Sequence, residues 1–171
     1  MPFVPFHDTF PDLAERETRT LTILDDTKLP AGDYALIEMY CDEPGCDCRR
    51  VFFWVLSSQT SQVEAIIAYG WENTRFYAQW MGDGDPQMAK ALKGPILNPG
   101  SPQAAFAPAL LDLVKNVVVQ DEQYVARLKT HYAMFRETIG PKRKVQQPRQ
   151  KKSRRPRLTN AQKRQRRRQR S

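Results

Sequence analysis

The sequence predicts an α+β fold, in which an antiparallel β-meander of about four strands is covered by helices that follow it in the chain. Three observations predict this class. The first half of the chain contains short segments rich in β-branched and aromatic residues. The connections between these segments are too short for parallel crossovers. After Gly70 the apolar residues recur with the period of a helix instead.

Four segments in the first half are predicted strands. Residues 19–24 (RTLTIL) alternate threonine with leucine and isoleucine, which is the period of a half-buried strand. A turn at residues 29–33 (LPAGD) separates this strand from the next one. The remaining strands are expected at residues 34–40 (YALIEMY), 51–56 (VFFWVL) and 63–69 (VEAIIAY).

The middle of the chain predicts helices that are interrupted by glycine and proline. One helix is expected between an N-cap at Asn73 and a terminal glycine, Gly82. A short helical segment precedes the loop PILNPGSPQ. The next helix begins near Ser101 or Ala107, two starts that the neighbouring prolines leave open, and runs to about Gln120.

The last helix is predicted to run from Asp121, its N-cap, to the stop signal formed by Gly140 and Pro141. Its apolar residues recur at spacings of three and four, so they lie on one face of the helix. This stripe consists of Tyr124, Leu128, Tyr132, Phe135 and Ile139. We expect this face to pack on the sheet.

Charge divides the chain into two parts, a domain of residues 1–140 and a tail of residues 141–171. The domain has 12 basic and 19 acidic residues, a net charge of −7, whereas the tail has 15 basic residues and no acidic one. With few apolar residues, the tail cannot bury enough surface to fold alone, and it is predicted to be disordered in isolation.

The sequence contains no apolar run of about 18 residues, the length that a membrane-spanning helix needs. The N-terminus, MPFVPFHDTFPDL, lacks the basic and continuous apolar regions of a signal peptide. These features predict a cytoplasmic protein, and in that compartment thiols stay reduced, so a stable disulfide is disfavoured.

All three cysteines fall within YCDEPGCDCRR, as Cys41, Cys46 and Cys48. The Pro-Gly turn between them folds the chain back, so the end of one strand can face the start of the next. Residues two apart in extended chain point to the same side. The three thiolates can therefore converge on one ion, and zinc would need one further ligand to complete a tetrahedron.

The fourth ligand is left open by the sequence. His131, beside the apolar stripe of the last helix, is the nitrogen donor that we assign to the site, and His7 is the other histidine of the chain. Asp42, Glu43 or Asp47 could supply an oxygen instead, or a water could fill the position.

Three other interpretations of the cysteines compete with metal binding: plain buried thiols, a disulfide, and redox chemistry. If metal is bound, a structural zinc is favoured over a catalytic one. Three thiolates weaken zinc as a Lewis acid, and neither H-E-x-x-H nor a zinc-deaminase motif is present.

The strings YCDEPGCDCRR, YGWE, WMG, LKGPILNPGSPQ and LKTHYAMFRE resemble a family of uncharacterised bacterial proteins that carry this cysteine hairpin. The resemblance spans roughly residues 29–138 and implies metal binding by Cys41, Cys46 and Cys48, without implying an activity. Many similar proteins end in a SEC-C-type zinc tail. This chain departs from that pattern, because no cysteine follows Cys48 and the C-terminus is basic.

The tail resembles arginine-rich peptides that fold on RNA, since a possible N-cap at Thr159 or Asn160 precedes AQKRQRRRQR. Such a tail should bind nucleic acid, RNA above all, largely without sequence specificity. The alternatives are a solubilising tail, an internal counter-ion for the acidic domain, or a membrane-surface segment. The residues assigned to nucleic acid are Arg154, Arg155, Arg157, Lys163, Arg164, Arg166, Arg167, Arg168 and Arg170.

Together these observations predict a non-enzymatic zinc-binding protein whose basic tail binds nucleic acid. Two alternatives from other classes stay open. One is a small metal- or thiol-dependent enzyme that uses the cysteines directly. The other is an adaptor whose acidic domain recognises a protein partner and whose tail only localises it.

Overall fold

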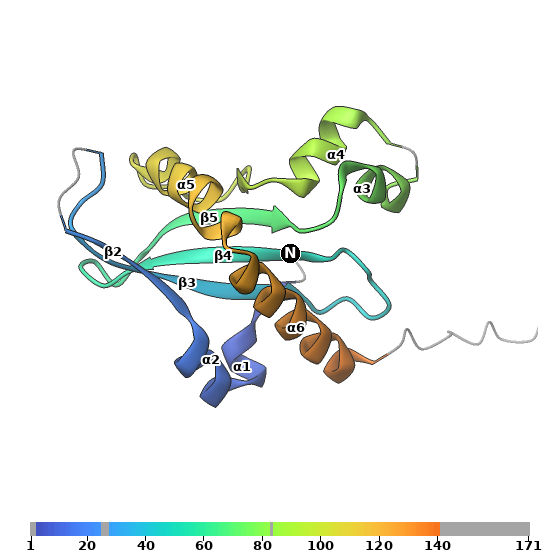
Figure 1. Cartoon of the computed structure of the whole chain (residues 1–171), viewed down its shortest axis with the longest axis horizontal. Coiled ribbons are helices and arrows are strands. Elements are labelled where there is room, and N and C mark those ends of the chain that lie inside the picture. Colours follow the sequence, from blue (N-terminus) through green and yellow to red (C-terminus); the bar gives the residue numbers. More distant parts are fainter. Residues whose placement is uncertain (1–2, 25–27, 83, 141–171) are drawn as a thin grey trace, which may run out of the picture.

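The computed structural model describes residues 3–24, 28–82 and 84–140, and these form a mixed sheet-and-helix domain (Figure 1). The predicted α+β class is confirmed. The strands are β1 (Phe3–Pro5), β2 (Arg19–Ile23), β3 (Gly32–Cys41), β4 (Arg50–Ser57), β5 (Val63–Gly70) and β6 (Ile96–Leu97). The helices are α1 (Phe6–Thr9), α2 (Pro11–Glu17), α3 (Thr74–Trp80), α4 (Pro86–Lys93), α5 (Ala107–Asn116), the 3₁₀ helix η1 (Val118–Gln120) and α6 (Glu122–Ile139).

The four predicted strands correspond to β2, β3, β4 and β5, and they form the antiparallel meander that was expected. Two further strands extend the sheet, because β6 pairs with β5, and β1 pairs with β3. Strands β1 and β2 share one edge of β3: Phe3 lies opposite Cys41, whereas Arg19 lies opposite Leu36. Strand β1 therefore supports the end of β3 that carries the first cysteine.

One face of the sheet carries the main core. Alternate residues of β3 point to this face, from Tyr34 through Leu36 and Glu38 to Tyr40, and all four are buried. Helices α1, α2, α5 and α6 contribute the opposing side chains. Figure 1 shows α6 running diagonally across the sheet, with its C-terminal half near the β3–β4 connection.

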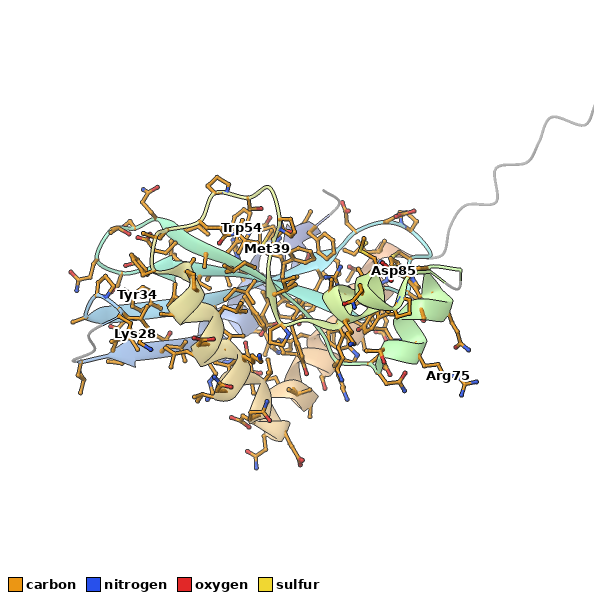
Figure 2. All side chains as sticks on the ribbon, turned by 90° about the horizontal axis from the view of Figure 1, so that it is seen from above. Lys28, Tyr34, Met39, Trp54, Arg75 and Asp85 are labelled. Atoms are coloured by element: carbon orange, nitrogen blue, oxygen red, sulfur yellow. The ribbon has the colours of Figure 1, made fainter. Side chains whose placement is uncertain are left out.

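The other face of the sheet has a smaller apolar cluster of Met39, Phe52 and Ala68. A groove of about 220 Å³ lies there, lined by Phe3, Met39, Phe52, Trp54, Ile66, Asn98 and Ser101. Met39 and Trp54 lie on the side of the sheet away from α5 and α6 (Figure 2).

The two predicted N-caps, Asn73 and Asp121, are confirmed. The side chain of Asn73 accepts a hydrogen bond from the Phe76 amide, and that of Asp121 accepts from the amides of Gln123 and Tyr124. Helix α5 begins at Ala107, one of the two starts that the sequence left open, and not near Ser101. It ends at Asn116, before the short 3₁₀ helix η1. Helices α1 and α2 were not predicted.

No helix in the described part of the chain is long and apolar enough to cross a membrane. The tail of residues 141–171, with its predicted disorder and its helix start, lies outside the described residues.

Candidate metal centre

The β3–β4 connection, residues 42–49, folds back through a turn that its sequence dictates. The amide of Cys46 donates a hydrogen bond of 3.1 Å to the carbonyl of Glu43. Between them lie Pro44, whose fixed φ suits the first central position, and Gly45, whose φ is +71°. Proline followed by a residue of positive φ is the pattern of a type II turn. The turn returns Cys46 toward the end of β3.

The three cysteines converge, as the spacing predicts. The sulfur atoms of Cys41, Cys46 and Cys48 all lie within 4.8 Å of one another, which is a separation that a shared metal ion can bridge. All three are free thiols. Cys41 and Cys48 are each 3% exposed, while Cys46 is partly exposed. The group is thus nearly enclosed, with Cys46 on its open side.

Side chains from two helices hold this connection in place. The guanidinium of Arg136, on α6, donates hydrogen bonds to the carbonyls of Cys41 and Glu43, at 2.9 and 3.1 Å. The Tyr132 hydroxyl, one turn earlier, accepts from the Arg49 amide at 3.4 Å. From α3, the Tyr77 hydroxyl donates to the Arg49 carbonyl at 2.9 Å. Both ends of the cysteine-bearing segment are therefore fixed to the domain.

Arg49 organises the acidic residues around the cysteines. Its φ is +48°, so the chain turns sharply between Cys48 and β4. Its guanidinium makes two 3.0 Å hydrogen bonds to Asp47 and one of 3.1 Å to Glu72. The carboxylate of Asp47 is thus occupied by an arginine. Among the described residues, neither Asp47 nor the other predicted oxygen donors, Asp42 and Glu43, joins the three sulfurs.

Burial favours the neutral thiols. It raises the pKa of Cys48 far above its usual value, and negative charge on Cys46 or Cys41 raises it further. Burial also raises the pKa of Cys41, although a backbone hydrogen bond at the hairpin opposes this. A reactive cysteine needs a lowered pKa. Burial therefore disfavours the thiolate form of these two cysteines, and a bound cation would favour it by replacing their protons.

Arg50 follows Cys48 by two residues, and its guanidinium lies over the ring of Phe52, 5.2 Å from the ring centroid. Burial lowers the pKa of Arg50, and the neighbouring Cys48 and Tyr77 act in the opposite direction. Its Nε is buried and has no hydrogen-bond partner. A positive charge therefore interacts with Cys48, and the buried Nε of the same guanidinium has no acceptor within the described ranges.

The assignment of His131 as the fourth ligand is corrected by the structure. His131 is buried on α6, as its place beside the apolar stripe suggested, but both ring nitrogens face carboxylates. Nδ1 lies 2.8 Å from Glu38 and Nε2 lies 3.1 Å from Glu17. Phe6 stacks on the ring at 4.4 Å between centroids. The imidazole thus completes its hydrogen bonds away from the cysteines.

The other histidine does not join the cysteines either. His7 lies in α1, and its Nε2 is 3.1 Å from the exposed carboxylate of Asp8. Within the described residues, the candidate metal group consists of the three cysteines alone.

Glu38 was missed by sequence reasoning, although a signal for it was present. In the predicted strand YALIEMY it falls on the same face as Leu36 and Tyr40, so it must point into the core. A buried carboxylate needs hydrogen-bonding partners. The Tyr40 hydroxyl donates to it at 2.8 Å, and His131 supplies the second contact. The nearby histidine on the last helix could have been matched to this need.

The residues assigned to nucleic acid in the tail lie outside the described residues, so the structure places none of them. Comparison with known proteins finds no matching family model, no matching curated protein and no matching solved structure. The resemblance to a bacterial cysteine-hairpin family stays a prediction.

Proposed function

We propose that this chain is a non-enzymatic zinc-binding protein whose cysteine hairpin holds one structural zinc ion and whose basic tail binds RNA. The observation that carries the first half is the convergence of three sulfurs within 4.8 Å in a segment that two helices anchor. Thiolate sulfur is a preferred ligand of zinc. A cytoplasmic location, where thiols stay reduced, accords with this use of cysteine.

The charges around the hairpin support a divalent ion. Three thiolates and one Zn²⁺ carry a net charge of −1, and Arg50 beside Cys48 would offset it. Among the described residues, the buried Nε of Arg50 has no hydrogen-bond partner. A water would complete the tetrahedron on the partly exposed side of Cys46.

A structural role fits the place of the site in the fold. The ion would join the end of β3 to the start of β4 across a connection that has no regular secondary structure. The raised pKa values of Cys41 and Cys48 make these two thiols poor nucleophiles. The adaptor function stays a prediction.

The second half of the proposal rests on composition. Residues 141–171 hold 15 basic residues and no acidic one, and the final segment is dominated by arginine. Arginine contacts phosphates through paired hydrogen bonds and stacks on bases. Each phosphate contact releases counter-ions, so the affinity should fall steeply with salt.

Zinc binding is tested by native mass spectrometry of the reduced protein together with thiol counting. We expect one zinc per chain and protection of all three thiols from alkylation. The matched variant Cys46→Ser removes the most accessible sulfur and should lose the ion. A protein that holds no zinc and whose thiols react freely would refute the structural-zinc proposal.

RNA binding is tested by deleting residues 141–171 and measuring the affinity for a single-stranded RNA across a salt series. The intact chain should bind with a steep negative salt slope. The truncated chain should lose binding by at least about 100-fold, because non-specific affinity comes almost wholly from phosphate contacts. Unchanged affinity and slope after truncation would refute the tail assignment.

A further inference from the structure

We propose that the same three thiols bind trivalent arsenic, supplied as arsenite, in a complete three-coordinate complex. The inference rests on the proposed function only in requiring that Cys41, Cys46 and Cys48 serve one ion. It does not require that the ion be zinc. The site would then bind a second class of ligand, namely oxyacids of a trivalent element that prefers sulfur, such as arsenite.

The ligand count supports this assignment. The described residues bring three sulfurs together and add no fourth histidine, cysteine or carboxylate ligand to the group. Both ring nitrogens of His131 are occupied by Glu38 and Glu17. Residues 141–171 contain no cysteine, histidine, aspartate or glutamate. Among the residues that the structure describes, zinc finds no fourth ligand, whereas trivalent arsenic forms three bonds to sulfur and needs none.

The binding step is balanced without a redox partner. Three thiols react with one arsenous acid molecule, As(OH)₃. Three As–O bonds and three S–H bonds break, three As–S bonds form, and each hydroxyl leaves with a thiol proton as water. Arsenic stays trivalent and every sulfur keeps its oxidation state. Reactants and product are all neutral.

Burial favours a neutral product. Cys41 and Cys48 are each 3% exposed, and placing net charge in such surroundings is costly unless it is compensated. The arsenic complex carries no net charge, so it needs no counter-ion. The zinc complex carries −1, and Arg50, two residues after Cys48 in the chain, is the neighbouring cation that would compensate this charge. The two ions should therefore respond differently to the loss of Arg50.

The test is arsenite titration of the full chain, kept reduced with a phosphine, followed by native mass spectrometry. We expect a mass gain equal to one arsenic atom less three hydrogen atoms. Cys46→Ser should weaken arsenite binding by more than about 100-fold, since even the loss of an outer-shell partner of a metal ligand commonly costs about 10- to 100-fold. Arg50→Gln should weaken zinc binding and leave arsenite affinity unchanged within about twofold.

Each result of these titrations supports or overturns one of the two binding proposals. An adduct that retains one hydroxyl and loses only two hydrogens, or equal binding by Cys46→Ser, would overturn three-sulfur coordination. Failure of arsenite to bind while zinc binds would overturn this inference and leave the proposed function intact. Arsenite binding without zinc binding would sustain the inference and refute the structural-zinc proposal. Circular dichroism of each variant checks that the fold survives, and a misfolded Cys46→Ser is replaced by Cys46→Ala.

Discussion

Two buried polar groups lie along the contact between β3 and α6, and they differ in how they are satisfied. In the middle of the contact, the imidazole of His131 lies between the carboxylates of Glu38 and Glu17. At the end of β3, the thiol of Cys41 lies close to the thiols of Cys46 and Cys48. The first group pairs a base with acids, whereas the second gathers like groups.

The difference separates a group that serves folding from one that suits binding. Glu38 and His131 supply each other with charge and a hydrogen bond, so the pair needs no ion from outside the chain. Three thiols cannot do this, because they gain no strong partner in one another and repel when ionised. The predictions below test this contrast, from the largest expected effect to the smallest.

Replacing His131 by phenylalanine should destabilise the fold most. The buried carboxylate of Glu38, whose Oε1 already has no hydrogen-bond partner, would lose its basic partner. Breaking a buried ion pair on one side commonly costs about 3–5 kcal/mol. Urea unfolding of the metal-free protein measures this loss. The control Glu17→Gln, at a carboxylate that is 32% exposed, should cost about 1 kcal/mol or less. Equal losses would contradict the asymmetry between the two carboxylates.

Adding zinc should stabilise the wild-type protein and not the Cys46→Ser variant. At a free zinc concentration of 100 times the dissociation constant, the free energy of unfolding should rise by about 2.7 kcal/mol. Without zinc, the variant should unfold within about 0.5 kcal/mol of wild type, since Cys46 is partly exposed. Thermal unfolding with and without zinc checks both values. A full zinc-induced rise in the variant would show that the ion binds elsewhere.

Arg136→Met should weaken the site by loosening the cysteine-bearing segment. The guanidinium donates to the carbonyls of Cys41 and Glu43, and each such bond contributes about 1 kcal/mol. We expect roughly a fivefold loss of zinc affinity, measured by competition with a chelating dye. Arg127→Met is the matched control on the same helix, because Arg127 contacts Glu17 instead of the hairpin. Equal losses in the two variants would contradict the positioning role.

The His131 group should also give a small pH dependence. Burial lowers the pKa of His131, but the hydrogen bonds and charges of Glu38 and Glu17 outweigh this, so the pKa lies above its ordinary value of 6.5. A raised pKa stabilises the fold fully below pH 6.5, and this contribution is lost as the pH rises through the folded-state value. The difference in unfolding free energy between wild type and His131→Phe should therefore shrink as the pH rises above 6.5. A gap that widens would contradict the sign.

The sequence predicts the regular parts of the fold well, because they obey local rules. Period-two alternation locates β2, and short segments rich in β-branched and aromatic residues locate β3 to β5. The short polar side chains of Asn73 and Asp121 act as caps where expected. The missed elements depend on distant partners. Strand β1 is three residues long and exists by pairing with β3, while β6 has only two residues. Neither is long enough to carry a period.

The candidate site shows the same division between local and distant information. The Pro-Gly turn brings Cys41, Cys46 and Cys48 together within ten residues of chain, so spacing alone predicts their convergence. The predicted partner of His131 was wrong, because the actual partner depends on how α6 lies across β3. Glu38 and His131 are 93 residues apart in the chain. The sequence predicted a position for the histidine beside the apolar stripe of the helix and left its partners undetermined.

X-ray absorption at the zinc edge of the zinc-loaded protein tests the central claim most directly. If one ion is shared by the hairpin thiols, the spectrum will show three sulfur neighbours at about 2.3 Å and one lighter atom from water. Two or fewer sulfur neighbours, or the scattering pattern of a histidine ring, would contradict a site built from the three cysteines alone.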